Sequence, residues 1–488
     1  AVGYLAGTEV TTGISNTLIG STAGDALTDA DDNTAVGTFA LGVDTLGSKS
    51  TAIGRGALAN QNFTTATNAD NVAVGFNAGS SVTTGVENTL IGAEAGDALT
   101  TGEKNTYVGY GAGTADDLGS RNVGVGRGAF ASLNFATATS ANNTAVGYDA
   151  GFSCTVGINN VLYGSNAGYA LTDADANVVV GRSALATDTL GSTSTAIGTF
   201  ALQNQNFTTA TNSHNVAVGY NAGNDITTGI RNTLLGSSAG DALTVGVQNV
   251  ALGREALGAD TKGNNSVAIG NSALRVQNFT TATDTNNTAV GDQAGIAVTT
   301  GVQNTLIGGL AGAAITTGSQ NTLIGTLCCD NLTTGSNVVA VGRNVSPSAV
   351  DITEEIIIGT TITGGGHDTV RIGTGNGGTA TLSLDGSDTS WAAASDLRLK
   401  KDVANSTVGL NFINDLRPVT FKWNSKDAIA DTLPQYNKDS SDPIYGEGKA
   451  HHGFIAQEVK TVIDNHSDVV NGHNLWSEDP DGTQQVSP

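Results

Sequence analysis

The chain has 488 residues, of which 66 are glycine, while only 13% are charged and 5% are aromatic. Lys and Arg total 21 against 44 Asp and Glu, so the formal net charge is −23, and this field argues against nucleic acid or an anionic membrane as a direct partner. No apolar run approaches the roughly 18 residues that cross a bilayer, and a core built mainly from Ala, Val, Ile and Leu favours a repeat protein.

The chain opens with Ala1-Val2-Gly3, which matches the middle of a repeat found throughout the sequence. We therefore expect a natural N-terminal segment to precede Ala1, and we expect that segment to carry the contacts with other proteins of the assembly.

A short motif of Asn, Thr, two apolar residues and Gly recurs, as in Asn16-Thr17-Leu18-Ile19-Gly20 and Asn88-Thr89-Leu90-Ile91-Gly92. Its glycines are spaced 17, 17, 17 and then 21 residues apart, and this 72-residue cycle repeats four times. The longer step carries an Asn-Phe pair, which recurs at Phe63, Phe135, Phe207 and Phe279. A regular period of this kind predicts stacked units.

Each unit follows fixed rules. From Asn16 to Asn321, the residue four before the glycine is Asn, or Ser at Ser50, Ser194 and Ser266, and the residue three after it is always Ala up to Ala311. The glycine predicts a turn with positive φ or little room for a side chain. The Asn side chains predict a hydrogen-bonded ladder between units, and the β-branched residues before the glycine favour short strands.

We therefore predict an all-β protein, a parallel β-solenoid of 17- and 21-residue coils over residues 1–345. Glycine and β-branched residues interrupt every candidate helix there, and the strictly placed apolar positions argue against disorder. At about 4.8 Å per coil, some twenty coils make a rod on the order of 100 Å long.

The three cysteines are too few for a disulfide framework and lack metal-ligand spacing. Cys328 occupies the slot otherwise held by Ala, and Cys154 occupies an apolar slot of the 72-residue period, so both are expected in the core. The repeat gives no reason for Cys329.

The runs Ser266-Val267-Ala268-Ile269-Gly270 and Asn287-Thr288-Ala289-Val290-Gly291 resemble the head repeats of trimeric autotransporter adhesins, and similar repeats occur in phage fibres. The resemblance covers about residues 1–345 and implies a β-roll in which three chains pack around one axis, hence a homotrimer. The period here is longer than the usual adhesin coil.

After Gly342 the motif fades. Residues 346–394 contain Ile356-Ile357-Ile358 and Gly364-Gly365-Gly366, which indicate a β-rich neck. From Ser395 onward Lys, Pro, Trp and His become common, and residues 453–463 are compatible with a helix, so a small α+β domain is expected over 395–488.

This last region carries three ordered motifs: Ser395-Asp396-Leu397-Arg398-Leu399-Lys400, then Leu416-Arg417-Pro418-Val419, then His452-Gly453-Phe454-Ile455-Ala456-Gln457-Glu458. They resemble the endosialidase-type intramolecular chaperone, a self-cleaving domain at the C-termini of phage tailspikes and fibres. The family domain continues into a further helix, so either that helix lies beyond Pro488 or the domain is shortened.

A serine becomes a nucleophile when a base takes its proton, and a lysine with a lowered pKa can be that base. By resemblance, Ser395 attacks the Ala394–Ser395 peptide bond with Lys400 as the general base. Without the family, a Ser and a Lys five residues apart indicate nothing. The other chaperone-motif residues that the resemblance singles out are Asp396, Arg398, His452, Gly453, Phe454, Gln457 and Glu458. His452 is either functional or structural, and Glu458 is expected to pair with a basic group.

The sequence thus favours a phage fibre that reaches a host receptor, glycan or protein, from an extracellular virion. The alternatives are a bacterial surface adhesin of the same architecture and a polysaccharide-degrading tailspike. Paired carboxylates for such an enzyme, or for calcium, are confined to Asp29, Asp31, Asp32, Asp173 and Asp175, which we interpret as solvated turns. We expect no cofactor, no metal and no catalysis beyond one self-cleavage.

Overall fold

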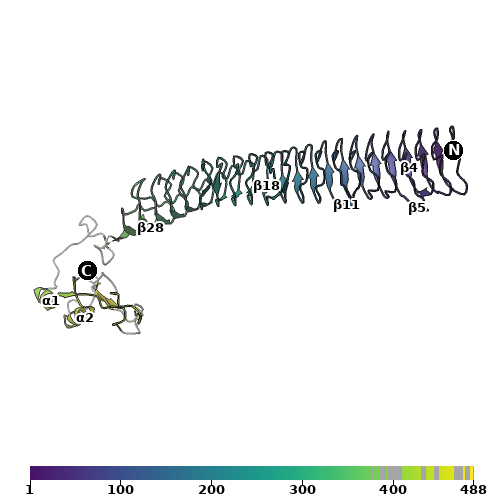
Figure 1. Cartoon of the computed structure of the whole chain (residues 1–488). Coiled ribbons are helices and arrows are strands. Elements are labelled where there is room, and N and C mark those ends of the chain that lie inside the picture. The colour runs from purple at the N-terminus through teal and green to yellow at the C-terminus, as the bar shows by residue number, and fades with distance from the viewer. Residues whose placement is uncertain are drawn as a thin grey trace. The chain divides into compact units, whose positions relative to one another are not determined.

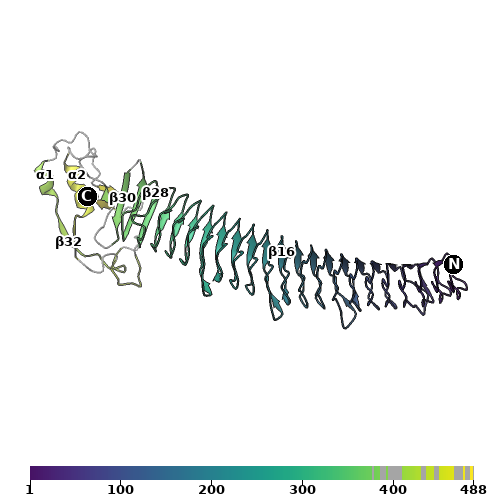
Figure 2. The same ribbon diagram turned by 90° about the horizontal axis from the view of Figure 1, so that it is seen from above.

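The structure is a computed structural model that describes residues 1–375, 378–384, 392–393, 409–429, 436–443, 450–466, 476–478 and 484–486. It separates into two compact units, Ala1–Asp388 and Thr389–Pro488. The first unit is a stack of about 21 coils, drawn from two sides in Figures 1 and 2. The expected all-β solenoid of 17- and 21-residue coils is confirmed.

Each coil contributes one short strand to a long parallel sheet in which neighbouring strands pair residue for residue, Thr17 with Thr34 and Leu18 with Ala35. These strands are β1 Thr17–Ile19, β2 Thr34–Val36, β4 Thr51–Ile53, β6 Val72–Val74, β7 Thr89–Ile91, β8 Thr106–Val108, β10 Val123–Val125, β12 Thr144–Val146, β13 Val161–Tyr163, β14 Val178–Val180, β16 Thr195–Ile197, β18 Val216–Val218, β19 Thr233–Leu235, β20 Val250–Leu252, β22 Val267–Ile269, β24 Thr288–Val290, β25 Thr305–Ile307, β26 Thr322–Ile324 and β27 Val339–Val341.

Successive side chains of a strand point to opposite faces. The middle residue of each strand therefore lies inside the coil, as Leu90 does at 0% exposure, while its two neighbours Thr89 and Ile91 face outward. The sheet has one face toward the narrow interior and one face outside.

The glycine after each strand has both properties expected from its regular spacing. Gly20 has φ +134, and a Cβ added to it would lie 2.6 Å from the carbonyl carbon of Gly37 in the next coil. Any side chain there would collide with the neighbouring backbone, so glycine is required. Below, positions in a coil are counted from this glycine.

The interior is filled in two alternative ways. Ala at position +3 is buried in every coil from Ala23 to Ala311, and it packs inside its own chain. Where +4 is glycine, an apolar residue at +7 occupies the space, except after Gly113, where +7 is Asp116: a Cβ on Gly24 would lie 2.8 Å from Cδ1 of Leu27. Where +4 is a buried leucine, position +7 is a buried Asp or Gln, as Asp44 after Leu41 and Gln61 after Leu58.

The 21-residue coils carry their four additional residues in a loop that projects from one side of the stack at regular intervals (Figure 2). At the base of each loop the Phe of the Asn-Phe pair is nearly buried, Phe63 at 5% exposure. Two-residue strands pair beside these loops: β3 Gly47–Ser48 with β5 Thr67–Asn68, β9 Gly119–Ser120 with β11 Thr139–Ser140, β15 Gly191–Ser192 with β17 Thr211–Asn212, and β21 Gly263–Asn264 with β23 Thr283–Asp284.

The predicted asparagine ladder is present in the interior. Nδ2 of Asn88 donates to the carbonyl oxygen of Gly102 at 3.0 Å, and its Oδ1 accepts from the backbone N–H of Asn105 at 3.0 Å. The same pattern recurs from coil to coil, so each buried amide bonds to the next coil.

The parallel stack continues beyond residue 345. β27 pairs with β28 Glu355–Thr360, which pairs with β29 Thr369–Thr374, and only β30 Gly378–Ser383 joins in the antiparallel sense. Ile357 is buried and Gly359 has φ +155, so this segment keeps the inward residue and the glycine turn of a coil. The expected β-rich neck, 346–394, therefore begins inside the stack.

The second unit contains the two-residue strand β31 Ala392–Ala393, two antiparallel hairpins and two helices. β32 Val419–Phe421 pairs with β33 His451–Gly453, and β34 Trp476–Glu478 pairs with β35 Gln484–Val486. Helices α1 Leu410–Asp415 and α2 Ala456–Asn465 pack through Phe412, Val459 and Ile463. Among the described segments, neither helix has the length and apolar character needed to cross a bilayer.

Candidate functional site

The candidate site of the second unit comprises the three sequence motifs, of which the structure describes the later part. Ala394, Ser395 and Lys400, the expected cleavage site and dyad, lie outside the described residues, as do Asp396 and Arg398. The geometry below concerns the remaining motif residues, from His452 to Glu458, and what surrounds them.

The β32–β33 hairpin places the histidines. Val419 pairs with Gly453, Thr420 with His452 and Phe421 with His451, so the second and third motifs form one ladder. His452 is exposed, and its Nδ1 lies 3.1 Å from Oγ1 of Thr420 across the two strands. This contact gives the His452 ring a fixed place on the outer face of the hairpin.

His451 points to the other face of the hairpin. Its ring stacks on Phe421 at 5.8 Å between centroids, and Phe421 meets Trp423 edge to face at 5.3 Å. Nε2 of His451 is buried and has no hydrogen-bond partner among the described residues. A buried polar nitrogen without a partner is costly, so this atom is a candidate for contact with a group outside the described part.

Helix α2 carries the rest of the motif. Phe454 and Ile455 precede it with exposures of 43% and 37%, while the backbone carbonyl of Gln457 accepts from Oγ1 of Thr461 at 2.9 Å. The side chain of Gln457 is exposed. Two adjacent apolar side chains thus lie on the surface at the start of the helix, next to the hairpin that carries the histidines.

The expected ion pair of Glu458 is confirmed, and its partner is Arg417 of the second motif. Nε of Arg417 donates to Oε2 of Glu458 at 2.9 Å, and NH2 donates to Oε1, so the contact is bidentate. The hydrogen bonds from Arg417 hold the pKa of Glu458 below its ordinary value. The pair joins the start of α2 to the segment before β32, which is a positioning role.

A second link was not foreseen from the sequence. Nε2 of His466, the residue that caps α2, lies 2.8 Å from Oδ2 of Asp415 at the end of α1, and its ring meets Phe412 edge to face. Asp415 and His466 are 51 residues apart in the chain, and neither belongs to a quoted motif. Only the packing of α1 against α2 brings them together.

The acidic residues in the turns of the solenoid have structural roles. Oδ1 of Asp31 accepts from the backbone N–H of Ile14 at 2.7 Å, and Oδ1 of Asp175 accepts from Ile158 at 2.8 Å. Asp29 instead accepts from the side-chain hydroxyl of Thr12. These carboxylates bind the turn of the preceding coil. In the part of the chain that the structure describes, no group of three or more His, Cys, Asp or Glu side chains is placed to hold a metal ion.

The cysteines are core residues. Cys154 and Cys328 are fully buried in the slots that the repeat predicts. Cys329, for which the repeat offered no reason, occupies position +4 with φ +49 and is also fully buried. Leu58 stands at the same position with φ +50, so the signal was present in the repeat.

Comparison with known families decides the nature of the second unit. Residues 395–468 match the family described as chaperone of endosialidase. No curated protein and no solved structure matches the chain. A parallel β-solenoid followed by a chaperone of this family fits a protein of the tail-fibre or tailspike type.

Proposed function

We propose that the protein is a homotrimeric phage fibre that attaches the virion to its host, and that its C-terminal chaperone domain cuts itself off after assembly. Support comes from the outward face of the long sheet. Ile19, Leu235 and Ile358 are each about 40% exposed there, and they belong to a column with one apolar residue per coil.

This outer column is defined by the last residue of each strand and contains no charged or amide side chain. It consists of Ile19, Val36, Ile53, Val74, Ile91, Val108, Val125, Val146, Tyr163, Val180, Ile197, Val218, Leu235, Leu252, Ile269, Val290, Ile307, Ile324 and Val341, continued by Ile358 and Ile372. In the 19 three-residue strands of the long sheet, the first residue also faces outward and is Thr or Val.

None of the described side chains in the outer column or at the first position of these strands is charged, in a chain with 44 acidic and 21 basic residues. A continuous apolar column along the sheet is the kind of exposed surface that marks an interaction site. A second and third copy have the same coil spacing, so their columns meet coil by coil along the full length. This matching repeat favours copies of the chain itself as the partners.

The chaperone domain answers a folding problem. Parallel strands from distant parts of a chain pair slowly, and three chains must also agree on register. A C-terminal domain that trimerises first raises the effective concentration of the three solenoids and aligns their ends. Once the domain has been removed, a fibre that unfolded would have no template for reassembly. The stability of the fibre is then kinetic, because it depends on the rate of unfolding.

The proposed cleavage follows from the family motif. The hydroxyl oxygen of Ser395 adds to the carbonyl carbon of Ala394 while Lys400 takes the hydroxyl proton. The peptide nitrogen leaves as the free amine of Ser395, and water hydrolyses the resulting ester. The exposed His452 hairpin and the Arg417–Glu458 pair belong to the domain that holds these groups.

The test compares the full-length protein with its Ser395→Ala variant by intact mass and by unheated and boiled gels. We expect the wild type to give a heat-sensitive trimer of the solenoid plus a released C-terminal fragment, and the variant to stay uncut. If the wild type and the variant both remain uncut trimers, the proposed cleavage is wrong. If both are monomers, the proposed trimeric fibre is wrong. Mass spectrometry of purified virions tests the phage origin. If the protein is absent from the virions, a bacterial surface adhesin is favoured.

A further inference from the structure

The repeat provides its own reference for every surface position, because residues 72 apart occupy the same place in the coil. In most coils the positions just after the glycine hold small or polar residues. Three aromatic residues of this region differ from their counterparts 72 residues earlier: Tyr110 in the coil from Gly109, Phe152 in the coil from Gly147 and Tyr169 in the next coil, whereas the first position is also aromatic at Phe76, Tyr148 and Tyr220.

These aromatics are not required by the fold. Thr38 stands where Tyr110 does, Ser80 stands where Phe152 does, and Asp97 stands where Tyr169 does. The strands of those coils pair in the same register. Tyr110 is 55% exposed, so it does not fill a core position either.

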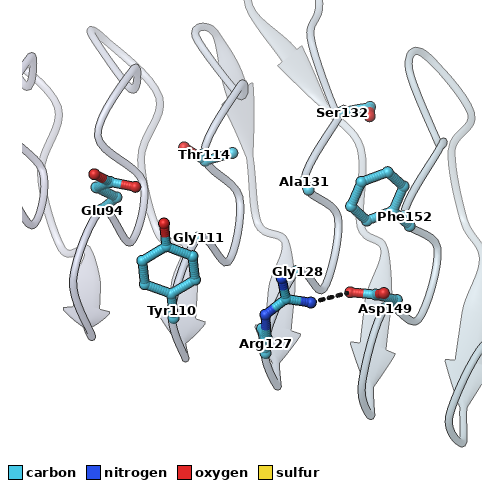
Figure 3. A pocket seen from close by; sticks show the side chains of 10 residues that line it. All are labelled: Glu94, Tyr110, Gly111, Thr114, Arg127, Gly128, Ala131, Ser132, Asp149 and Phe152. Carbon is cyan, nitrogen blue, oxygen red and sulfur yellow. Dashed lines mark ion pairs between the residues drawn. The ribbon is translucent and has the colours of Figure 1, made fainter.

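Tyr110 and Phe152 border a groove of about 300 Å³ that crosses four successive coils (Figure 3). Its floor is open because Gly111 and Gly128 occupy position +2 with φ +62 and +66. Other coils carry a side chain there at the same φ, such as Glu94 at +59 and Asn77 at +55. Nothing lies within 4 Å of a Cβ built on Gly111, so the missing side chain leaves room above the backbone.

Polar groups converge at one end of the groove. The guanidinium of Arg127 lies 5.2 Å from the ring centroid of Tyr148 and donates to its hydroxyl at 2.9 Å. NH1 of Arg127 is also 3.6 Å from Oδ1 of Asp149 (Figure 3). That oxygen is buried and has no hydrogen-bond partner among the described residues, so an acceptor is unused beside an aromatic surface.

Phe152 extends the aromatic surface. Its ring lies nearly parallel to that of Tyr169, with centroids 5.4 Å apart and planes at 8°. Flat apolar rings next to a few hydrogen-bonding groups are the usual composition of a small-ligand site. The C–H faces of a pyranose ring pack on such aromatics, while its hydroxyls need the acceptors and donors that Asp149 and Arg127 supply.

We propose that this groove binds a glycan built from neutral hexose or N-acetylhexosamine units. The charge favours a neutral ligand, because Arg127 is already paired with Asp149 and Glu94 lies at the other end of the groove. An anionic sugar would meet two carboxylates on a chain of net charge −23. That the glycan comes from a host surface rests on the proposed function, whereas the binding chemistry does not.

The groove uses a different part of the coil from the outer column. Its lining residues all lie at positions +1 to +6, in the turn after the strand. The outer column lies on the strands themselves. Trimer formation through the sheet and glycan binding in the turns therefore involve separate side chains of each coil.

The test applies the full-length protein to an array of neutral hexose, N-acetylhexosamine and sialylated oligosaccharides, followed by titration with the best probe. We expect a neutral glycan to bind, and the variants Tyr110→Thr and Gly111→Gln to weaken it at least tenfold. Both introduce residues that other coils carry at the same positions, Thr38 and Gln293, so the coil is retained. The control Phe39→Ser removes an equally exposed aromatic elsewhere, as Ser183 does naturally, and should bind as wild type.

Three outcomes would contradict the proposal that the groove binds a neutral glycan: no bound glycan, binding of sialylated glycans alone, or unchanged affinity in both groove variants. A peptide or protein partner would give the first of these results. The trimer and cleavage assays are independent of this readout. A cleaved trimer that ignores all glycans therefore refutes the groove alone, while an uncleaved monomer that binds a neutral glycan refutes the fibre alone.

Discussion

The hydroxyl of Tyr107 donates a 2.5 Å hydrogen bond to Oδ2 of Asp116 in the closed interior of the solenoid. Oδ1 of Asp116 accepts from the backbone N–H of Gly119 at 2.9 Å. In the preceding 72-residue repeat the same buried acid, Asp44, accepts instead from the amide of Gln61 at 2.6 Å. One buried carboxylate is thus satisfied by two different side chains that reach it from opposite neighbouring coils.

The first prediction concerns the pH dependence of stability. Burial raises the pKa of Asp116 to about 6 from its ordinary 3.8. The folded protein therefore holds this proton more tightly than the unfolded chain, so the associated stability is fully present below pH 3.8 and is lost as pH rises through 6. We expect about 3 kcal/mol to be lost between pH 4 and pH 7.

The Asp116→Asn variant isolates this effect because Asn does not titrate, while every other acid is unchanged. Thermal unfolding of wild type and variant at pH 4.5 and 7.5 gives the comparison. The variant should gain stability relative to wild type as pH rises. A constant difference between the two proteins would show that Asp116 keeps its ordinary pKa when folded.

A second prediction follows from the space around Tyr107. A Cβ on Gly113 would lie 2.4 Å from the tyrosine ring, and one on Gly124 would lie 2.9 Å from it. Leucine and alanine occupy those positions 72 residues earlier, at Leu41 and Ala52. The two glycines therefore make room for the ring.

Tyr107→Ala leaves a cavity and removes the hydroxyl that donates to Oδ2 of Asp116, and it should cost about 3–5 kcal/mol. Adding Gly113→Leu refills the space with the residue used in the neighbouring repeat. The double variant should recover part of the loss, and the single Gly113→Leu should destabilise on its own, which a double-mutant cycle of unfolding free energies measures. Additive effects would show that the two positions do not share this space.

The sequence predicted those features that recur in every coil. The glycine turn, the strand with one inward residue, the Asn ladder and the slot of Cys154 all follow from position in the period. The compensation of Tyr107 by Gly113 could not be predicted, because it depends on which side chains of adjacent coils meet inside. The Asp415–His466 link was missed for the same reason, since it depends on how two short helices pack.

A third prediction concerns the Asn ladder. Asn232 is buried, donates to the carbonyl of Gly246 at 2.9 Å, and accepts from the backbone N–H of Asn249 at 3.0 Å. Asn232→Ala leaves a buried donor and a buried acceptor of the backbone without partners, at a cost of about 2–5 kcal/mol. Thermal unfolding should show the loss, whereas Asn221→Ser, at a half-buried turn position that Ser238 fills in the next coil, should change little.

The last prediction concerns the outer column. Ile197 and Leu235 lie on the outward face of β16 and β19 with exposures of 37% and 44%, so replacing them changes no interior contact. In a trimer that buries the column, Ile197→Lys with Leu235→Lys places two charges per chain in an apolar interface, where unpaired charge is strongly unfavourable. Light scattering after gel filtration should show a shift from trimer toward monomer with far-UV circular dichroism unchanged. The matched control, Ser237→Lys with Ser238→Lys, adds the same charge on the turn after β19 and should leave the trimer intact. If the column variant also remains trimeric, the three chains associate through another face of the coil.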